Sequence, residues 1–231
     1  MDQYMRASSV PAEVESSFFA GVYRWMATGL FVSALSAFAL LASPGLMRVV
    51  FGNPILMILL VVGELGLVFW LSARVTTMSL TSAVVGFTAF SALNGVTIAA
   101  ILVMYTYASV VSTFVITAGT FLIFSVYGYT TKKDLSSLGS ICFMGLIGII
   151  LASLVNIFLK SPAIYWVTTY IGIGIFIGLI VYDTQRLKAM CHAGAGSQEM
   201  TGKLAILGAL TLYLDFINLF ILLLRLFGKR R

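Results

Sequence analysis

The longest stretch of the chain without a charged side chain runs from residue 75 to residue 131 and covers 57 positions. An apolar stretch of 18 or more residues without charges indicates a membrane-spanning helix, and one span takes about 20 residues. The stretch therefore predicts two consecutive spans. We expect the turn between them near Tyr105, Thr106 and Tyr107, because tyrosine is enriched where a protein meets the membrane surface.

The composition of the whole chain supports a membrane location. Of its 231 residues 60% are hydrophobic, and only 14 Lys and Arg and 8 Asp and Glu carry charge. An average soluble domain has about 25% charged residues. So few charges do not cover the surface of a water-soluble fold of this size. A soluble enzyme, a nucleic-acid-binding domain and a disordered chain are therefore excluded, and an all-α polytopic membrane protein is predicted.

The charge-poor stretches divide the chain into a short N-terminal tail (1–22), a single seven-helix transmembrane domain (23–228) and a basic C-terminal tail (229–231). The predicted helices are 24–42, 53–73, 79–103, 109–130, 137–158, 163–186 and 205–227.

The loop charges predict the orientation, because Lys and Arg collect in cytoplasmic loops. With the N-terminus in the cytoplasm, the inner segments hold eight cations and the outer loops hold two, Arg48 and Lys160. The inner cations are Arg6, Arg24, Arg74, Lys132, Lys133, Arg186, Lys188 and Lys203. Lys229, Arg230 and Arg231 count against this orientation, unless the last segment is re-entrant and returns the tail to the cytoplasm.

Three acidic residues lie inside the predicted spans: Glu64, Asp183 and Asp215. A charged side chain at the centre of a bilayer costs roughly 2.5–3.5 kcal/mol, so such residues indicate a functional site that faces the helix bundle. Polar residues also recur every third position in the third predicted helix, at Ser91, Asn94 and Thr97. They either line a path or form hydrogen bonds between helices.

Asp183 and Asp215 lie on consecutive helices, which we expect to be antiparallel neighbours. The two carboxyls reach the same depth only if the last helix begins near Met200. If they meet, the pair holds one proton over a wide pH range, because both groups cannot ionise cheaply. Arg74, at the end of the second predicted helix, has a suitable depth to hold the ionised form.

Four segments resemble the signatures of the transmembrane Bax inhibitor motif family, and the resemblance covers nearly the whole chain. They are Gly21–Met26, Gly128–Ser136, Tyr182–Gln185 and Leu212–Phe220. The short tails resemble those of bacterial members, which implies an integral protein of the bacterial inner (plasma) membrane; the loop charges predict that its N-terminus is cytoplasmic.

The resemblance implies a fold in which the seventh helix is central. It also implies a pH-sensitive calcium leak, in which Asp183 and Asp215 sense protons and bind Ca²⁺ transiently. Arg74 corresponds to a latch residue of the family, displaced by a residue or two, whereas Glu64 matches no family residue and is an additional intramembrane acid. The expected partners are the lipid bilayer, Ca²⁺ and protons, with no cofactor, no catalytic residue and no nucleic acid.

Two other functions fit parts of the sequence. Some bacterial relatives are associated with the modulation of a membrane-bound protease, so a non-channel regulator that binds such a protease is the alternative. Two membrane aspartates also suggest an intramembrane aspartyl protease. The segment before Asp215 is Leu212, Tyr213 and Leu214 rather than the Gly-x-Gly expected of that enzyme class, so we expect no enzyme.

Overall fold

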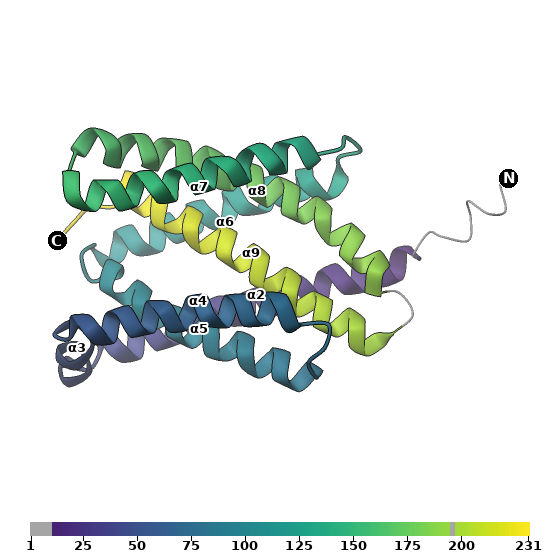
Figure 1. Cartoon of the computed structure of the whole chain (residues 1–231), viewed down its shortest axis with the longest axis horizontal. Helices are drawn as coiled ribbons and strands as arrows, with labels where there is room; N and C mark the ends of the chain where they lie inside the picture. Colours follow the sequence, from purple (N-terminus) through teal and green to yellow (C-terminus); the bar gives the residue numbers. More distant parts are fainter. Residues whose placement is uncertain (1–10, 195–196) are drawn as a thin grey trace, which may run out of the picture. The chain divides into compact units, whose positions relative to one another are not determined.

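The computed structural model describes residues 11–194 and 197–231. Seven helices in these ranges are long and apolar enough to cross a membrane, and an isolated bridge between Tyr105 and Arg230 is their only β pairing (Figure 1). The seven are α2 (Ala12–Leu41), α4 (Pro54–Arg74), α5 (Leu80–Leu102), α6 (Tyr107–Thr130), α7 (Ser136–Leu159), α8 (Pro162–Gly194) and α9 (Gln198–Phe227). The predicted all-α, seven-span fold is confirmed.

The first long helix begins twelve residues earlier than the sequence predicts, at Ala12 instead of residue 24. The predicted start was too late because the sequence analysis ended the helix at the charged residues that precede the apolar stretch. Glu13 and Glu15 occupy the first turn, where the helix dipole favours negative charge. Phe18 and Val22 are buried on the same extension, so this part of α2 is held by packing.

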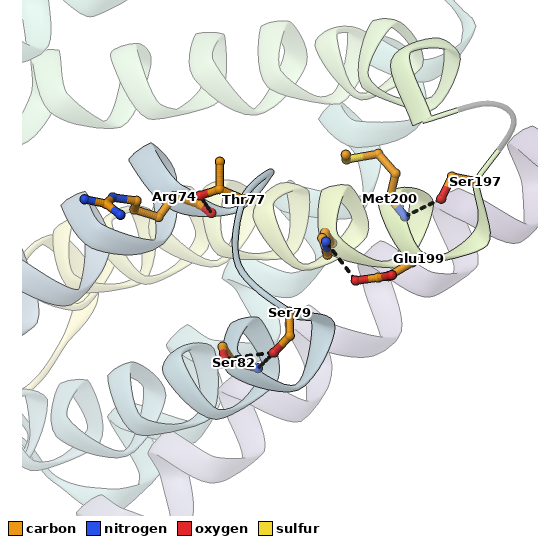
Figure 2. A network of polar contacts seen from close by, with 8 residues as sticks. Arg74, Thr77, Ser79, Ser82, Ser197, Glu199 and Met200 are labelled. Carbon is orange, nitrogen blue, oxygen red and sulfur yellow. Dashed lines mark hydrogen bonds and ion pairs between the residues drawn. The ribbon is translucent and has the colours of Figure 1, made fainter.

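The loop between the last two long helices is shorter than predicted, because α8 continues to Gly194 and α9 begins at Gln198. The start of α9 is capped by Ser197, whose hydroxyl accepts a hydrogen bond from the backbone N–H of Met200 at 3.3 Å (Figure 2). An ion pair of 2.8 Å between Lys203 and Glu199 supports the same turn. The helix therefore begins near Met200, as contact between the two aspartates requires.

A short helix that the sequence analysis did not predict, α3 (Pro44–Phe51), connects α2 and α4 (Figure 1). Ser43 caps it, and Pro44 occupies the first helical position, where the missing N–H of proline costs nothing. A helix of 8 residues is too short to cross a bilayer, so it does not change the number of spans.

The described helices form two compact units, and the first consists of the described residues within Met1–Met104 and Leu187–Tyr213. In this unit α5 packs against α2 and α4, and its start lies beside the start of α9, where a side chain at Gly202 would come within 3.2 Å of Leu80. Gly95 allows the closest approach of α2 and α5, because a side chain there would overlap the backbone of Ser33.

The second unit consists of Tyr105–Arg186 and Leu214–Arg231. In this unit α7 and α8 lie side by side, with Gly178 of α8 against the sulfur of Cys142 of α7. A cluster of four aromatic rings, at centroid distances of 5.3–6.1 Å, packs α6 against the second half of α9. The four residues are Phe114, Phe121, Phe216 and Phe220.

The last helix is the most buried of the seven. In its most apolar stretch 72% of the residues are buried, compared with at most 39% in any other spanning helix. Its residues up to Tyr213 belong to the first unit and those from Leu214 to the second. Asp215 therefore lies in the helix with the least exposure to lipid.

The orientation predicted from loop charge is testable by labelling. Arg6, one of the cations in that count, lies outside the described residues. A cysteine at Lys132, in the exposed α6–α7 loop, should react with a membrane-impermeant maleimide only from the cytoplasmic side, in a chain whose Cys142 and Cys191 are replaced by Ala. A cysteine at Arg48 on α3 is the matched control, which should react only from outside. Labelling of the loop from outside alone would overturn the orientation.

Candidate functional site

The side chains of Asp183 on α8 and Asp215 on α9 are in hydrogen-bonding contact within the second unit. Both are buried, with 8% and 5% of their surface exposed. A carboxylate oxygen only accepts hydrogen bonds, so a hydrogen bond between two carboxyls needs one of them to carry a proton. The structure thus brings together the two acids that the sequence analysis selected.

The surroundings of this pair supply few polar partners. Asp215 Oδ2 is buried and accepts no hydrogen bond from an N–H or hydroxyl donor in the described residues. Arg186 lies three residues beyond Asp183 on α8 and interacts with it electrostatically, and Cys142 of α7 lies within electrostatic range of both acids. Buried polar atoms in folded proteins nearly always have partners, so the contact with Asp183 is the polar interaction that remains for this carboxyl.

The residue two positions after Asp183 fastens α8 to the α6–α7 loop. The side-chain amide of Gln185 donates to the backbone carbonyl of Lys133 at 2.7 Å, and its oxygen accepts from the backbone N–H of Leu135 at 3.1 Å. The segment that carries Asp183 is thereby held to the segment between Gly128 and Ser136, which the sequence analysis selected separately. No sequence spacing indicated this connection.

Two glycines allow the same helices to approach closely. A side chain at Gly128 of α6 would overlap the backbone carbonyl of Val181 and approach Thr184 on α8. One at Gly139 of α7 would overlap the ring of Tyr182. The backbone of α8 beside Asp183 is therefore fixed by contacts on two sides, from α6 and from α7.

The third intramembrane acid, Glu64, belongs to the first unit and has different surroundings. Its carboxyl accepts hydrogen bonds from Thr97 Oγ1 at 2.7 Å and from Asn94 Nδ2 at 3.1 Å, both on α5. Asn94 and Thr97 therefore form hydrogen bonds between helices, one of the two uses predicted for the polar positions of α5. Glu64 faces protein, as a membrane acid is expected to.

The contacts of Glu64 continue into a chain of polar groups inside the first unit. Asn94 Oδ1 accepts from the hydroxyl of Tyr213 at 2.8 Å, and that hydroxyl lies 2.6 Å from Ser33 Oγ on α2. Ser33 Oγ also lies 2.7 Å from the backbone carbonyl oxygen of Ser91, which competes with the Tyr213 hydroxyl for the single proton of Ser33. Four helices share this network. The sequence analysis did not select Tyr213 for a role in it, because a tyrosine in an apolar helix gives no sign of its partner.

Arg74, the predicted latch, ends α4 in the first unit, where its side chain is exposed and its backbone carbonyl accepts a hydrogen bond from the Thr77 hydroxyl at 3.0 Å (Figure 2). The two aspartates belong to the second unit. The latch role stays a prediction.

In the ranges that the structure describes, no three His, Cys, Asp or Glu side chains come together as metal ligands. Ca²⁺ is held tightly by six to eight oxygen ligands. Two carboxyls alone therefore suit passing contact with a cation better than its permanent binding.

Comparison with known proteins agrees with the fold and with the positions of the signature segments. Residues 15–231 match the sequence model of the family described as "Inhibitor of apoptosis-promoting Bax1". The chain is 48% identical to the inner membrane protein YbhL of Escherichia coli K12 over the full length of both proteins. It is 41% identical to an uncharacterized protein of Borreliella burgdorferi, with 94% of each chain covered. An uncharacterized membrane protein of Streptococcus pyogenes serotype M1 is 36% identical, with 93% of each covered.

The seven spanning helices and these matches define an integral membrane protein. It belongs to the Bax inhibitor-1 family, which is the family whose signatures the sequence resembles.

A glycine substitution tests the close approach of α6 and α8. Gly128→Ala should lower the free energy of unfolding by about 1–3 kcal/mol, because the added methyl meets the backbone of Val181, which cannot rotate away. The measurement is reversible unfolding of the detergent-solubilised chain. Gly119→Ala on the same helix is the matched control, since nothing lies within 4 Å of its position and alanine favours the helix. Equal effects of the two changes would contradict the packing described.

The start of α7 should weaken in acid. Asp134, in the loop outside the spans, accepts hydrogen bonds from the side chain and the backbone N–H of Ser136, which lower the pKa of its carboxyl below the usual range. A carboxyl with a lowered pKa contributes stability above its ordinary pKa and loses it as pH falls through the lowered value. The carbon chemical shift of this carboxyl, followed by NMR, should titrate at lower pH in the wild type than in Ser136→Ala. Identical titrations would exclude the contact.

Proposed function

We propose that the protein is a pH-sensitive cation leak channel of the inner membrane, that it passes Ca²⁺, and that it is not an enzyme. The observation that supports this most is the contact between the buried carboxyls of Asp183 and Asp215. YbhL is named an inner membrane protein, and its identity of 48% over the full length of both chains supports the same location.

The carboxyl pair provides a response to pH without histidine. Two carboxyls in contact at a buried site share one proton, because two adjacent negative charges repel each other strongly where water is absent. Loss of that proton replaces an attractive hydrogen bond by repulsion between α8 and α9. The protonation state therefore favours one of two helix arrangements, which is how a local change in charge becomes a change in conformation.

The same residues offer a cation its preferred ligands. Ca²⁺ binds carboxylate oxygens, and Asp215 Oδ2 accepts no hydrogen bond from an N–H or hydroxyl donor within the described part of the chain. Two carboxylates are enough to attract a divalent cation and too few to retain it. We therefore propose transient contact during permeation, with protons competing for the same oxygens.

Arg74 and Glu64 have secondary roles in this proposal. Arg74 is the latch that stabilises the ionised pair, a role that rests on its resemblance to the family's arginine. Glu64 already accepts hydrogen bonds from Thr97 and Asn94, so its carboxyl is less available to respond to pH than that of Asp215. The alternative function, modulation of a membrane-bound protease, requires neither a pore nor a titrating pair.

Calcium flux into proteoliposomes across a pH series tests the proposal. The wild type should show a pH-dependent flux, and Asp183→Asn or Asp215→Asn should flatten that dependence, because an amide does not titrate. An amide N–H still donates to the remaining carboxyl, so the contact between the helices is kept. Asp134→Asn, which also removes a carboxyl from the second unit but outside the spans, should keep the full pH response.

The possible outcomes distinguish the aspartate pair from another pH sensor, and a channel from a regulator. If both aspartate variants keep the full pH response, the sensor lies elsewhere, and Glu64→Gln is the next variant to measure. If the folded wild type conducts no Ca²⁺ at any pH, the channel proposal is wrong and the regulator remains. A change in the pH response of Arg74→Gln, with an unchanged maximal flux, would support the latch.

A further inference from the structure

The end of the chain is folded back onto the start of α6 in the second unit. The backbone N–H of Thr106 donates to the carbonyl of Lys229 at 3.0 Å, and the N–H of Lys229 donates to Ser109 Oγ at 2.9 Å. Tyr105 and Arg230 form an isolated β bridge. The positions of the last residues are therefore set by the fold.

Two arginines of this segment lie against tyrosine rings. The guanidinium of Arg225 lies 5.5 Å from the ring centroid of Tyr165, and that of Arg230 lies 6.0 Å from the centroid of Tyr105. Arg230 also donates to the hydroxyl of Tyr165 at 3.4 Å. Cation–π contacts of this kind orient a guanidinium but leave its positive charge uncompensated.

The cations at this end of the second unit are Arg225, Lys229–Arg231 and Lys160, which lies between the end of α7 and the start of α8. We call this group the basic end. The acids of this unit lie far from it. Asp215 precedes Arg225 by ten helical residues, or about 15 Å, and Asp183 follows Tyr165 by eighteen, or about 27 Å. Asp134 lies in the loop after the opposite end of α6. Among the described residues, no ion pair involves a cation of this basic end.

The side chains near the basic end are typical of a membrane surface. Tyr107 and Trp166 are 78% and 41% exposed, and aromatic residues of this kind sit at the level of the lipid headgroups. Phe158 and Phe227 are 86% and 59% exposed, and they offer apolar surface next to the charged groups. A ligand that suits both features carries a negative headgroup and hydrocarbon chains.

We propose that the basic end binds an anionic phospholipid, with the phosphate at the cations and the acyl chains along the exposed phenylalanines. Arg and Lys bind phosphate oxygens through charge-assisted hydrogen bonds. Lys229 and Arg231 have exposed side chains with room for a headgroup, while Arg230 is oriented by its two tyrosines. The site is independent of the aspartate pair, so it stands whether or not the protein conducts Ca²⁺.

Thermal unfolding of the detergent-solubilised full chain tests the site, because a ligand that binds the folded state raises the midpoint in proportion to its occupancy. Phosphatidylglycerol should raise the unfolding midpoint in a saturable way and yield an apparent Kd. Lys229→Gln with Arg231→Gln should weaken this Kd roughly 30-fold, since each cation near an anionic lipid contributes a factor of about five. This double variant leaves the contacts of Arg230 with the tyrosines in place.

Three controls make the result specific. Lys132→Gln with Lys133→Gln removes the same charge from the α6–α7 loop of the same unit and should leave the Kd unchanged. Phosphatidylcholine should give a much smaller shift, and inorganic phosphate at millimolar concentration should give none. Should the double variant unfold without lipid, Arg231→Gln alone is measured and should weaken the Kd about 5-fold.

An unchanged Kd in the folded tail variant would overturn the proposal, as would an equal shift with phosphatidylcholine. The same shift with inorganic phosphate would assign the site to free phosphate and exclude a lipid as its specific ligand.

Discussion

The contact between two buried carboxyls, Asp183 and Asp215, joins α8 to α9 at the centre of the proposed site in the second unit. Acids in an apolar helix bundle are costly, and the surrounding structure keeps these two together. Gln185 fastens α8 to the α6–α7 loop, and Gly128 lets α6 approach the α8 backbone. These contacts hold the pair in place, and Asp215 Oδ2 accepts no hydrogen bond from an N–H or hydroxyl donor in the described residues.

Glu64 in the first unit is also an acid within a membrane-spanning helix, but its carboxyl is hydrogen-bonded to neutral side chains and not to a second acid. Both of its oxygens accept hydrogen bonds from α5, and the network continues through Asn94 to Tyr213 and Ser33. A carboxyl whose two oxygens both accept hydrogen bonds restrains the packing of its helices, because movement would leave half-buried polar groups without partners. The carboxyl of Glu64 in the first unit thus accepts hydrogen bonds at both oxygens, whereas Asp215 Oδ2 in the second unit accepts none from an N–H or hydroxyl donor in the described residues. This difference is the physical reason for proposing the aspartates, and not Glu64, as the pH-sensitive groups.

Charge-free stretches predicted the seven spans and the two aspartates, because a charge inside a bilayer is costly enough to be visible in the sequence. They predicted the helix ends less well. Glu13 and Arg24 delayed the predicted start of α2, although a helix can continue past charges once it leaves the membrane interior. The hydrogen bonds of Gln185 with the α6–α7 loop and the partners of Tyr213 were not predictable, since both depend on which helices are neighbours. The proposed lipid site uses residues after the end of α9. Their hydrogen bonds with the start of α6 join parts of the chain that are far apart in sequence, so no sequence pattern predicted them.

The claim that Asp183 and Asp215 share one proton can be measured directly by infrared difference spectroscopy of the purified protein in lipid. One protonated carboxyl should persist at neutral pH, shift on deuterium exchange, and change in frequency or disappear in both Asp183→Asn and Asp215→Asn. Its loss as pH rises should coincide with the change in calcium flux. A spectrum with no protonated carboxyl at neutral pH, or one that both substitutions leave unchanged, would contradict the account.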